Sequence, residues 1–192
     1  MEKSAEFLTR DQILIATEET LRRYGVAKTS VTDVAKALNV SHGTLYRHFK
    51  SKAELLEGAT AKWLDEKIIR PLKDVCHDPS LEGALHLKTY LQTLIGLKQH
   101  YAREDEELFT MYAKVTEESA ELIDQHVGHL IEQMSEILIR GAIQADNPAR
   151  LARTIFYATS RFHHPAHAYE WKHANMEQEF ADVWTLIEKG FL

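Results

Sequence analysis

The chain has 192 residues, of which 44% are hydrophobic and 27% are charged, as is ordinary for a soluble globular protein with a real core. Its eight glycines and four prolines are few, which favours helices over turn-rich β structure. Because we find neither an apolar run of about 18 residues nor an apolar N-terminal signal core, we expect a cytoplasmic protein with no membrane contact. The single cysteine, Cys76, excludes an internal disulfide framework and fits a reducing compartment.

The net charge of −6 is unevenly distributed along the chain. Residues 1–57 contain nine Lys and Arg against eight Asp and Glu, whereas the remainder contains 14 against 21. Binding to nucleic acid depends on a local basic face and not on the total charge. The N-terminal third is therefore where such a face is expected.

Four helices are predicted within the first third of the chain. Apolar residues at helical spacing predict a helix over residues 9–24, which Gly25 ends as a C-terminal cap. A second helix follows Thr29 or Ser30 as its cap and ends at Asn39, which tolerates a left-handed turn. A short third helix covers about His42 to Phe49. Ser51 and Glu54 then have the spacing of a capping box that opens the fourth.

The rest of the chain is also predicted to be helical. The fourth helix has no strong break before Pro71, where we expect it to kink or end. Four further helices follow, and one of them is expected to start at Asn147 and Pro148 and to run through Phe162 towards Pro165. A ninth helix carries Phe180, Val183, Trp184 and Ile187. The predicted fold is all-α, with three short helices followed by about six longer ones.

The second and third helices have the pattern of a helix-turn-helix unit. Ala35 is small enough for two helices to cross closely, and Leu45 and Phe49, four residues apart, hold the short helix against the core. The second helix of such a unit enters the major groove of DNA, so its outer face needs groups that meet base edges and phosphates. The stretch "VSHGTLYRHFKSKAELL" supplies small, hydroxylic, aromatic and basic groups there.

The stretch "TSVTDVAKALNVSHGTLYRHFKSKAELL" closely resembles the N-terminal domain of the TetR family of bacterial transcriptional regulators. The resemblance covers about residues 10–56, and beyond them only length, helical content and helix order agree. It implies a helix-turn-helix DNA-binding domain at residues 1–56 and a helical effector-binding and dimerisation domain at 57–192. The implied function is a ligand-responsive regulator, expected to be a repressor, that binds a palindromic operator as a homodimer and is released by a small molecule.

The resemblance and the chemistry of the side chains together give the predicted DNA contacts. Gly43 lets the backbone approach DNA closely, and Thr44 offers a hydroxyl and a methyl group to base edges. The full set is Thr29, His42, Gly43, Thr44, Tyr46, His48 and Lys52. The alternative is that these residues only cap and pack a helical bundle.

The resemblance to the TetR family implies a ligand pocket between the fourth and eighth helices. Aromatic, Met and His side chains there are candidates to line it, because they combine apolar area with a polar tip. They are Trp63, Tyr90, Phe109, Met111, Tyr112, His126 and Phe162. The alternative for each is a place in the ordinary core. Nothing in the sequence identifies the effector.

The last two predicted helices, about residues 148–190, are rich in large apolar groups. In the TetR family such helices form a four-helix bundle between protomers, which makes Phe156, Phe180, Trp184 and Ile187 candidates for the dimer interface. The alternative is that these side chains belong to the core of one protomer.

The stretch "RFHHPAHAYEWKH" at residues 161–173 contains His163 and His167, four residues apart, as in metal-binding histidine pairs. Pro165 weakens that spacing argument because it bends or ends a helix. A metal-sensing repressor with the same fold is therefore an alternative function. The other interpretations of these histidines are a polar wall of the pocket or of the dimer interface, and incidental surface residues.

The two alternatives from other classes of protein are an enzyme and a helical adaptor. An enzyme is disfavoured because the chain lacks the nucleophile elbow, the phosphate loop and the glycine-rich dinucleotide turn, and we expect no catalytic residue and no cofactor. A helical adaptor would leave the composition of residues 41–52 unexplained.

Overall fold

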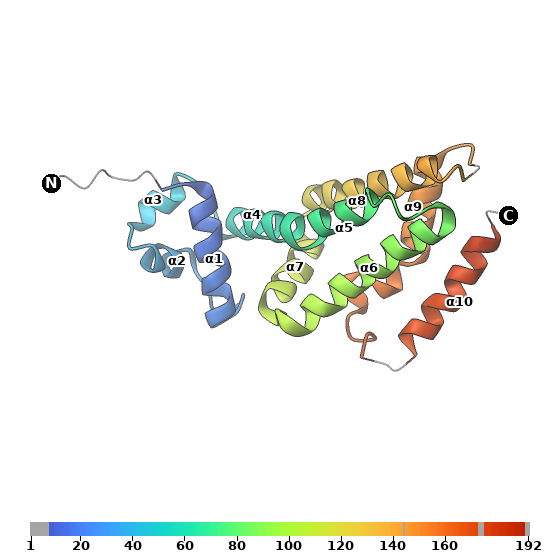
Figure 1. The fold of residues 1–192 in the computed structure, drawn as a ribbon. Helices are drawn as coiled ribbons and strands as arrows, with labels where there is room; N and C mark the ends of the chain where they lie inside the picture. The colour runs from blue at the N-terminus through green and yellow to red at the C-terminus, as the bar shows by residue number, and fades with distance from the viewer. Residues whose placement is uncertain (1–7, 144, 173–174, 191–192) are drawn as a thin grey trace. The chain divides into compact units, whose positions relative to one another are not determined.

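The computed structural model describes residues 8–143, 145–172 and 175–190. These residues form helices and turns and no strand, so the predicted all-α class is confirmed (Figure 1). They divide into two compact units. The first comprises residues 8–63 and 105–119, and the second comprises residues 64–104 and 120–190. In the described part of the chain, no helix is long and apolar enough to cross a membrane.

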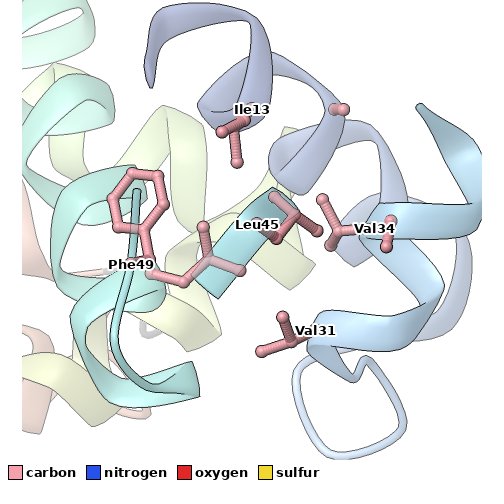
Figure 2. Packing of buried hydrophobic residues seen from close by; sticks show 8 residues of the cluster. Ile13, Val31, Val34, Leu45 and Phe49 are labelled. Atoms are coloured by element: carbon pink, nitrogen blue, oxygen red, sulfur yellow. The ribbon is translucent and has the colours of Figure 1, made fainter. Parts of the chain in front are cut away.

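The first unit contains α1 (Arg10–Tyr24), α2 (Val31–Ala37), α3 (His42–Tyr46), most of α4 (Lys52–Leu64), and α7 (Glu106–Glu118). One cluster of its core lies among the first four helices and includes Ile13, Val34 and Leu45, each with 0% exposure (Figure 2). Phe49 closes this core at 1% exposure. The helix α7 packs against α1, and Arg22 donates two hydrogen bonds, of 3.1 and 2.9 Å, to the Asp105 carboxylate.

Local signals in the sequence determine the end of α1 and both ends of α2 as predicted. The Ser30 hydroxyl accepts from the Asp33 N–H, and the Asp33 carboxylate accepts from the Ser30 N–H, which is a capping box. Gly25 ends α1 at a φ of 77°, and Asn39 adopts the left-handed region at a φ of 53°. The third helix is shorter than predicted. It ends at Tyr46, and a turn carries the chain on to Phe49.

The second unit contains α5 (Arg70–Cys76), α6 (Gly83–Glu104), α8 (Ala120–Arg140), α9 (Pro148–Ala158) and α10 (Met176–Lys189). The long helix α8 packs against α9, α6 and α5. Asn147 caps α9, and Pro148 occupies the first turn, both as predicted. The rings of Phe162 and Phe180, whose centroids are 5.5 Å apart, join α10 to the chain that follows α9.

The fourth helix, which the sequence predicted to kink or end at Pro71, ends earlier, at Leu64, and the chain stays helical beyond it. A π-helical turn, Asp65–Ile69, follows α4, and Pro71 lies in the first turn of α5, where a missing N–H is tolerated.

The helix α9 ends at Ala158 and does not reach Phe162, which lies in a separate 3₁₀ turn, Ser160–Phe162. The Thr159 hydroxyl donates to the Ile155 carbonyl, and the Thr159 backbone has left the helical region. A second 3₁₀ turn, Pro165–His167, begins at the proline.

Candidate functional site

The short helix α3 exposes a mixed polar and aromatic surface in the first unit. His42, Gly43 and Tyr46 are exposed, and Thr44 is half-buried. The rings of His42 and Tyr46, one helical turn apart, lie with centroids 4.5 Å apart. The two rings therefore form a close pair on the exposed surface of this helix.

Leu45 and Ser41 fix the orientation of this helix. Leu45 has 0% exposure and anchors α3 in the core, while the Ser41 hydroxyl accepts from the Thr44 N–H at 3.1 Å. The hydroxyls of Ser41 and Thr44 are 2.8 Å apart. These contacts hold α3 in a fixed orientation against the core, as a recognition helix requires.

Gly43 has no packing reason to be glycine. A Cβ built at this position would meet only the Ser41 Oγ, at 3.8 Å, which is ordinary contact. Its φ is not positive, so the backbone does not need glycine either. The absence of a side chain at Gly43 is useful only to something that approaches α3 from outside.

The charge around α3 is strongly basic. Residues 28–52 contain five Lys and Arg and one acidic residue, Asp33. Hydrogen bonds from Ser30 to the Asp33 carboxylate lower the pKa of that group. The side chains of Lys28, Lys36, Arg47 and Lys50 are exposed. These exposed basic side chains lie in the part of the chain where the sequence predicted a basic face, and their charge is opposite to that of a phosphate backbone.

The structure places Thr29 differently from the other candidate DNA contacts. Its exposure is 3%, and its hydroxyl donates to the Gly25 carbonyl at 2.8 Å. Its N–H also bonds to that carbonyl, at 3.0 Å. Thr29 therefore holds the loop between α1 and α2, and the exposed cap Ser30 replaces it as a candidate contact.

His48 and Lys52 lie at the edge of the same surface, half-buried. Arg10 donates to the His48 carbonyl at 2.6 Å, which fixes the turn that follows α3. The Lys52 ammonium donates to the Val26 carbonyl at 2.9 Å. Ser51 caps α4 as predicted, while the Glu54 carboxylate accepts from the Lys50 N–H and not from the Ser51 N–H.

Family models match both parts of the chain. Residues 13–59 match the model described as bacterial regulatory proteins, tetR family, and residues 84–184 match the model described as tetracyclin repressor-like, C-terminal domain. The chain belongs to the TetR family of transcriptional regulators. The expected family is thereby confirmed.

Named TetR-family relatives are similar mainly in the N-terminal region. The transcriptional regulator TtgR of Pseudomonas putida is 43% identical over 49 residues, which are 26% of this chain and 23% of TtgR. The probable acrEF/envCD operon repressor of Escherichia coli is 31% identical over 70 residues, which are 36% of this chain and 30% of that repressor. The matches thus span about a quarter to a third of these curated relatives.

Solved structures with the TetR fold are similar over nearly the whole chain. The regulator FadR of Bacillus subtilis, in complex with stearoyl-CoA, has a TM-score of 0.62 at 18% identity, over 93% of this chain and 97% of FadR. SmeT of Stenotrophomonas maltophilia, the repressor of an efflux pump, has a TM-score of 0.60 at 20% identity, over 95% and 90% of the two chains. At this identity the likeness establishes the fold.

The candidate effector residues of this TetR-family chain fall into two sets, one in each unit. Trp63, Phe109, Met111 and Tyr112 are buried in the first unit, where the ring centroids of Trp63 and Tyr112 are 5.7 Å apart. Tyr90, His126 and Phe162 are buried in the second, where the Tyr90 hydroxyl donates to Gln133 at 2.9 Å. All seven are core residues of their unit.

A buried basic cluster in the second unit was missed by the sequence analysis. Lys98 on α6 is 1% exposed, and its ammonium lies 3.3 Å from the Nε2 of His126 on α8. His163 is 3% exposed, and burial followed by the charge of Lys98 lowers its pKa to about 3. Desolvation also holds the pKa values of Lys98 and His126 well below their usual ranges. A signal existed in the sequence, because Lys98 continues the apolar stripe Leu87, Leu91 and Leu94 at helical spacing.

The candidate dimer residues are placed mainly inside one protomer. Phe156, Phe180 and Trp184 are 6%, 5% and 1% exposed, and only Ile187 is half-buried. Large apolar side chains that do reach the surface of the same helices are Tyr157 on α9, at 55%, and Leu186 on α10, at 72%. These exposed residues replace the buried three as candidates for an interface.

His163 and His167 do not form a metal-binding pair in the described structure. His163 lies in the core with its Nε2 3.2 Å from the Phe156 carbonyl, whereas the His167 Nδ1 lies 2.7 Å from Glu170. The 3₁₀ turn that begins at Pro165 removes the helical register that their spacing assumed. His173, at the end of this stretch, lies outside the described residues.

Proposed function

We propose that the chain is a repressor that binds palindromic operator DNA as a homodimer. The observation that carries this is the exposed surface of α3, where Gly43 leaves the backbone accessible and the rings of His42 and Tyr46 lie close together near basic side chains. A single helix of this length contacts few base pairs, so two copies reading half-sites about one helical turn apart, or a multiple of it, are needed for specificity. The relatives that are named as repressors support repression of transcription over activation.

Binding to the DNA that flanks the protein's own gene tests this proposal. Tyr46→Ala and Lys52→Ala should weaken binding to all sequences similarly, because these groups are assigned to phosphates. For Lys52→Ala the slope of log affinity against log salt concentration should fall by about one unit. Thr44→Ala and His42→Ala should instead change the preferred sequence, since they are assigned to base edges.

Matched variants away from α3 serve as controls for the DNA assay. Lys114→Ala and Lys189→Ala remove exposed ammonium groups from α7 and α10 and should leave operator affinity within about twofold. Unchanged affinity and sequence preference in all four α3-region variants would contradict the assignment of this surface.

We further propose that a small-molecule effector with an apolar body and an acidic group releases the protein from DNA. The buried cluster of Lys98, His126 and His163 supports this chemistry, because three basic side chains lie together where burial opposes their positive charge. A carboxylate among them would favour their protonated forms and gain charge-assisted hydrogen bonds.

A further inference from the structure

Three potential metal ligands meet where α5 ends against α8 in the second unit. They are the thiol of Cys76, the imidazole of His77 and the carboxylate of Glu136. Their donor atoms all lie within 4.8 Å of one another, and among the described residues this is the single group of three such side chains that meets this distance.

The spacing of the donor atoms fits a small tetrahedral ion. The Glu136 Oε2 lies 3.7 Å from the Cys76 Sγ and 3.6 Å from the His77 Nε2. Zinc bonds to sulfur at about 2.3 Å and to nitrogen or oxygen at about 2.0–2.2 Å, so in a tetrahedral site such donors lie roughly 3.3–3.6 Å apart. These two distances require adjustments of a few tenths of an ångström, and the Cys76 sulfur and the His77 imidazole nitrogen lie within 4.8 Å of each other.

The tautomer of His77 is already set for coordination. Its Nδ1 lies 2.7 Å from the Lys73 carbonyl oxygen, which can only accept a hydrogen bond. In the neutral imidazole Nδ1 therefore carries the proton, and the lone pair is on Nε2, the atom that faces Glu136. A backbone carbonyl that holds the distal N–H of a histidine is a usual second partner in metal sites, because it fixes the ring and raises its basicity.

Arg140 supplies a second partner for the sulfur. Its guanidinium donates to the Cys76 carbonyl, and its Nη2 lies 3.4 Å from the Cys76 Sγ. A thiolate ligand accepts such a hydrogen bond. With a divalent ion bound, the charges of the thiolate and the Glu136 carboxylate are balanced by the ion.

We propose that Cys76, His77 and Glu136 form a binding site for a borderline divalent transition-metal ion of the zinc type, with water as the fourth ligand. Sulfur, imidazole nitrogen and one carboxylate oxygen suit zinc or cobalt, whereas magnesium and calcium prefer oxygen donors alone. The ion would join the end of α5 to α8. The proposal does not depend on DNA binding, so it can fail while the proposed function stands.

Cobalt(II) titration of the reduced, chelator-treated full chain tests this site. Since Cys76 is the single cysteine in the chain, a thiolate-to-cobalt charge-transfer band in the near ultraviolet can arise only from Cys76. We expect the band to appear on titration, to vanish when zinc displaces cobalt, and to be unaffected by magnesium. Cys76→Ser should abolish it.

Variants of the two exposed ligands decide whether the ion occupies this site. His77→Ala and Glu136→Gln should each weaken cobalt binding at least about tenfold. Both side chains are exposed, so these variants should fold, which circular dichroism checks. The matched controls are Glu132→Gln, one turn earlier on α8, and His164→Ala, which should bind cobalt like the unchanged protein. The absence of a band, or an unchanged affinity in both ligand variants, overturns the proposal.

Discussion

Gly43 separates the two explanations of the α3 surface at the level of one residue. If α3 only packs the bundle, a side chain at this position is harmless, because a Cβ meets nothing closer than 3.8 Å. If α3 lies against DNA, the same methyl group stands where the partner must approach. Stability and DNA affinity should therefore respond to a substitution here in opposite directions.

Gly43→Ala is the first test at this scale. Alanine in place of a helical glycine should leave the free energy of unfolding unchanged or raise it by up to about 1 kcal/mol. Operator affinity should fall at the same time. Denaturant unfolding and a DNA titration of the same preparation measure both quantities, and an affinity equal to that of the unchanged protein would argue against close contact at α3.

His163 gives a second prediction, on the pH dependence of stability. Burial, the charge of Lys98 and that of His164 lower its folded pKa to about 3 from 6.5. The unfolded state therefore binds more protons between these values, and stability falls as the pH drops below about 6.5. From pH 7 to pH 5 this single group removes about 2 kcal/mol at most.

His163→Gln should flatten that loss. The glutamine amide can still donate to the Phe156 carbonyl, as the His163 Nε2 does, but it does not titrate. Thermal or urea unfolding at pH 7 and pH 5 measures the difference, with His129→Gln as a control on an exposed histidine of α8. If the stability of the unchanged protein and that of His163→Gln depend on pH in the same way, His163 is not held in its neutral form in the folded protein.

At the scale of helices, the sequence predicted those ends that local side chains determine. The Ser30 capping box, the glycine after α1, the left-handed Asn39 and the Asn147 cap of α9 all depend on residues within a few positions of the helix end. The end of α9 was predicted wrongly, because the apolar spacing runs on to Phe162 while the chain turns at Thr159.

The burial of Thr29 and Trp184 shows a second limit of the sequence. A threonine before a helix can cap, contact a partner or close a loop, and only the fold shows that its hydroxyl bonds to Gly25. A stripe of aromatic residues likewise does not reveal which neighbour it faces. The Lys98 cluster was missed because a lysine is read as a surface residue unless its position on the apolar stripe is checked.

The face of α10 supplies a prediction about assembly. Residues two positions apart on a helix point about 200° apart. Because Trp184 is buried, Leu186 points away from the core and is 72% exposed. Leu186→Glu should therefore leave the protomer folded and convert a dimer into monomers, because a charge in an apolar interface costs several kcal/mol.

Trp184→Glu is the contrasting variant on the same helix. It places a carboxylate at a position that is 1% exposed in the protomer, so it should unfold the second unit instead. Sedimentation and circular dichroism distinguish the two outcomes. A Leu186→Glu variant that remains a tight dimer would place the interface on another face.

At the scale of the whole molecule, regulation requires the two units to influence each other. The chain passes from the first unit to the second within α4, which begins at Lys52 and continues into the π-helical turn Asp65–Ile69. An effector changes the affinity of the protein for DNA only if it binds the free protein and the DNA-bound protein with different free energies. The change in the free energy of DNA binding equals that difference. A useful switch needs about 1–3 kcal/mol, which corresponds to about 5- to 150-fold in affinity.

The binding of amphipathic carboxylic acids, each compared with its primary amide, tests this coupling and the role of Lys98. An acid that binds should lower operator affinity by the same factor by which operator DNA lowers the affinity for the acid, since the coupling is reciprocal. The neutral amide should bind more weakly, and Lys98→Met should remove the preference for the acid while leaving operator affinity without effector unchanged. Calorimetric titration of the acid and of its amide, each with and without operator DNA, gives the four dissociation constants. Equal binding of acid and amide would remove the role given to Lys98, and an acid that binds without altering operator affinity would leave the protein a DNA-binding regulator with a different signal.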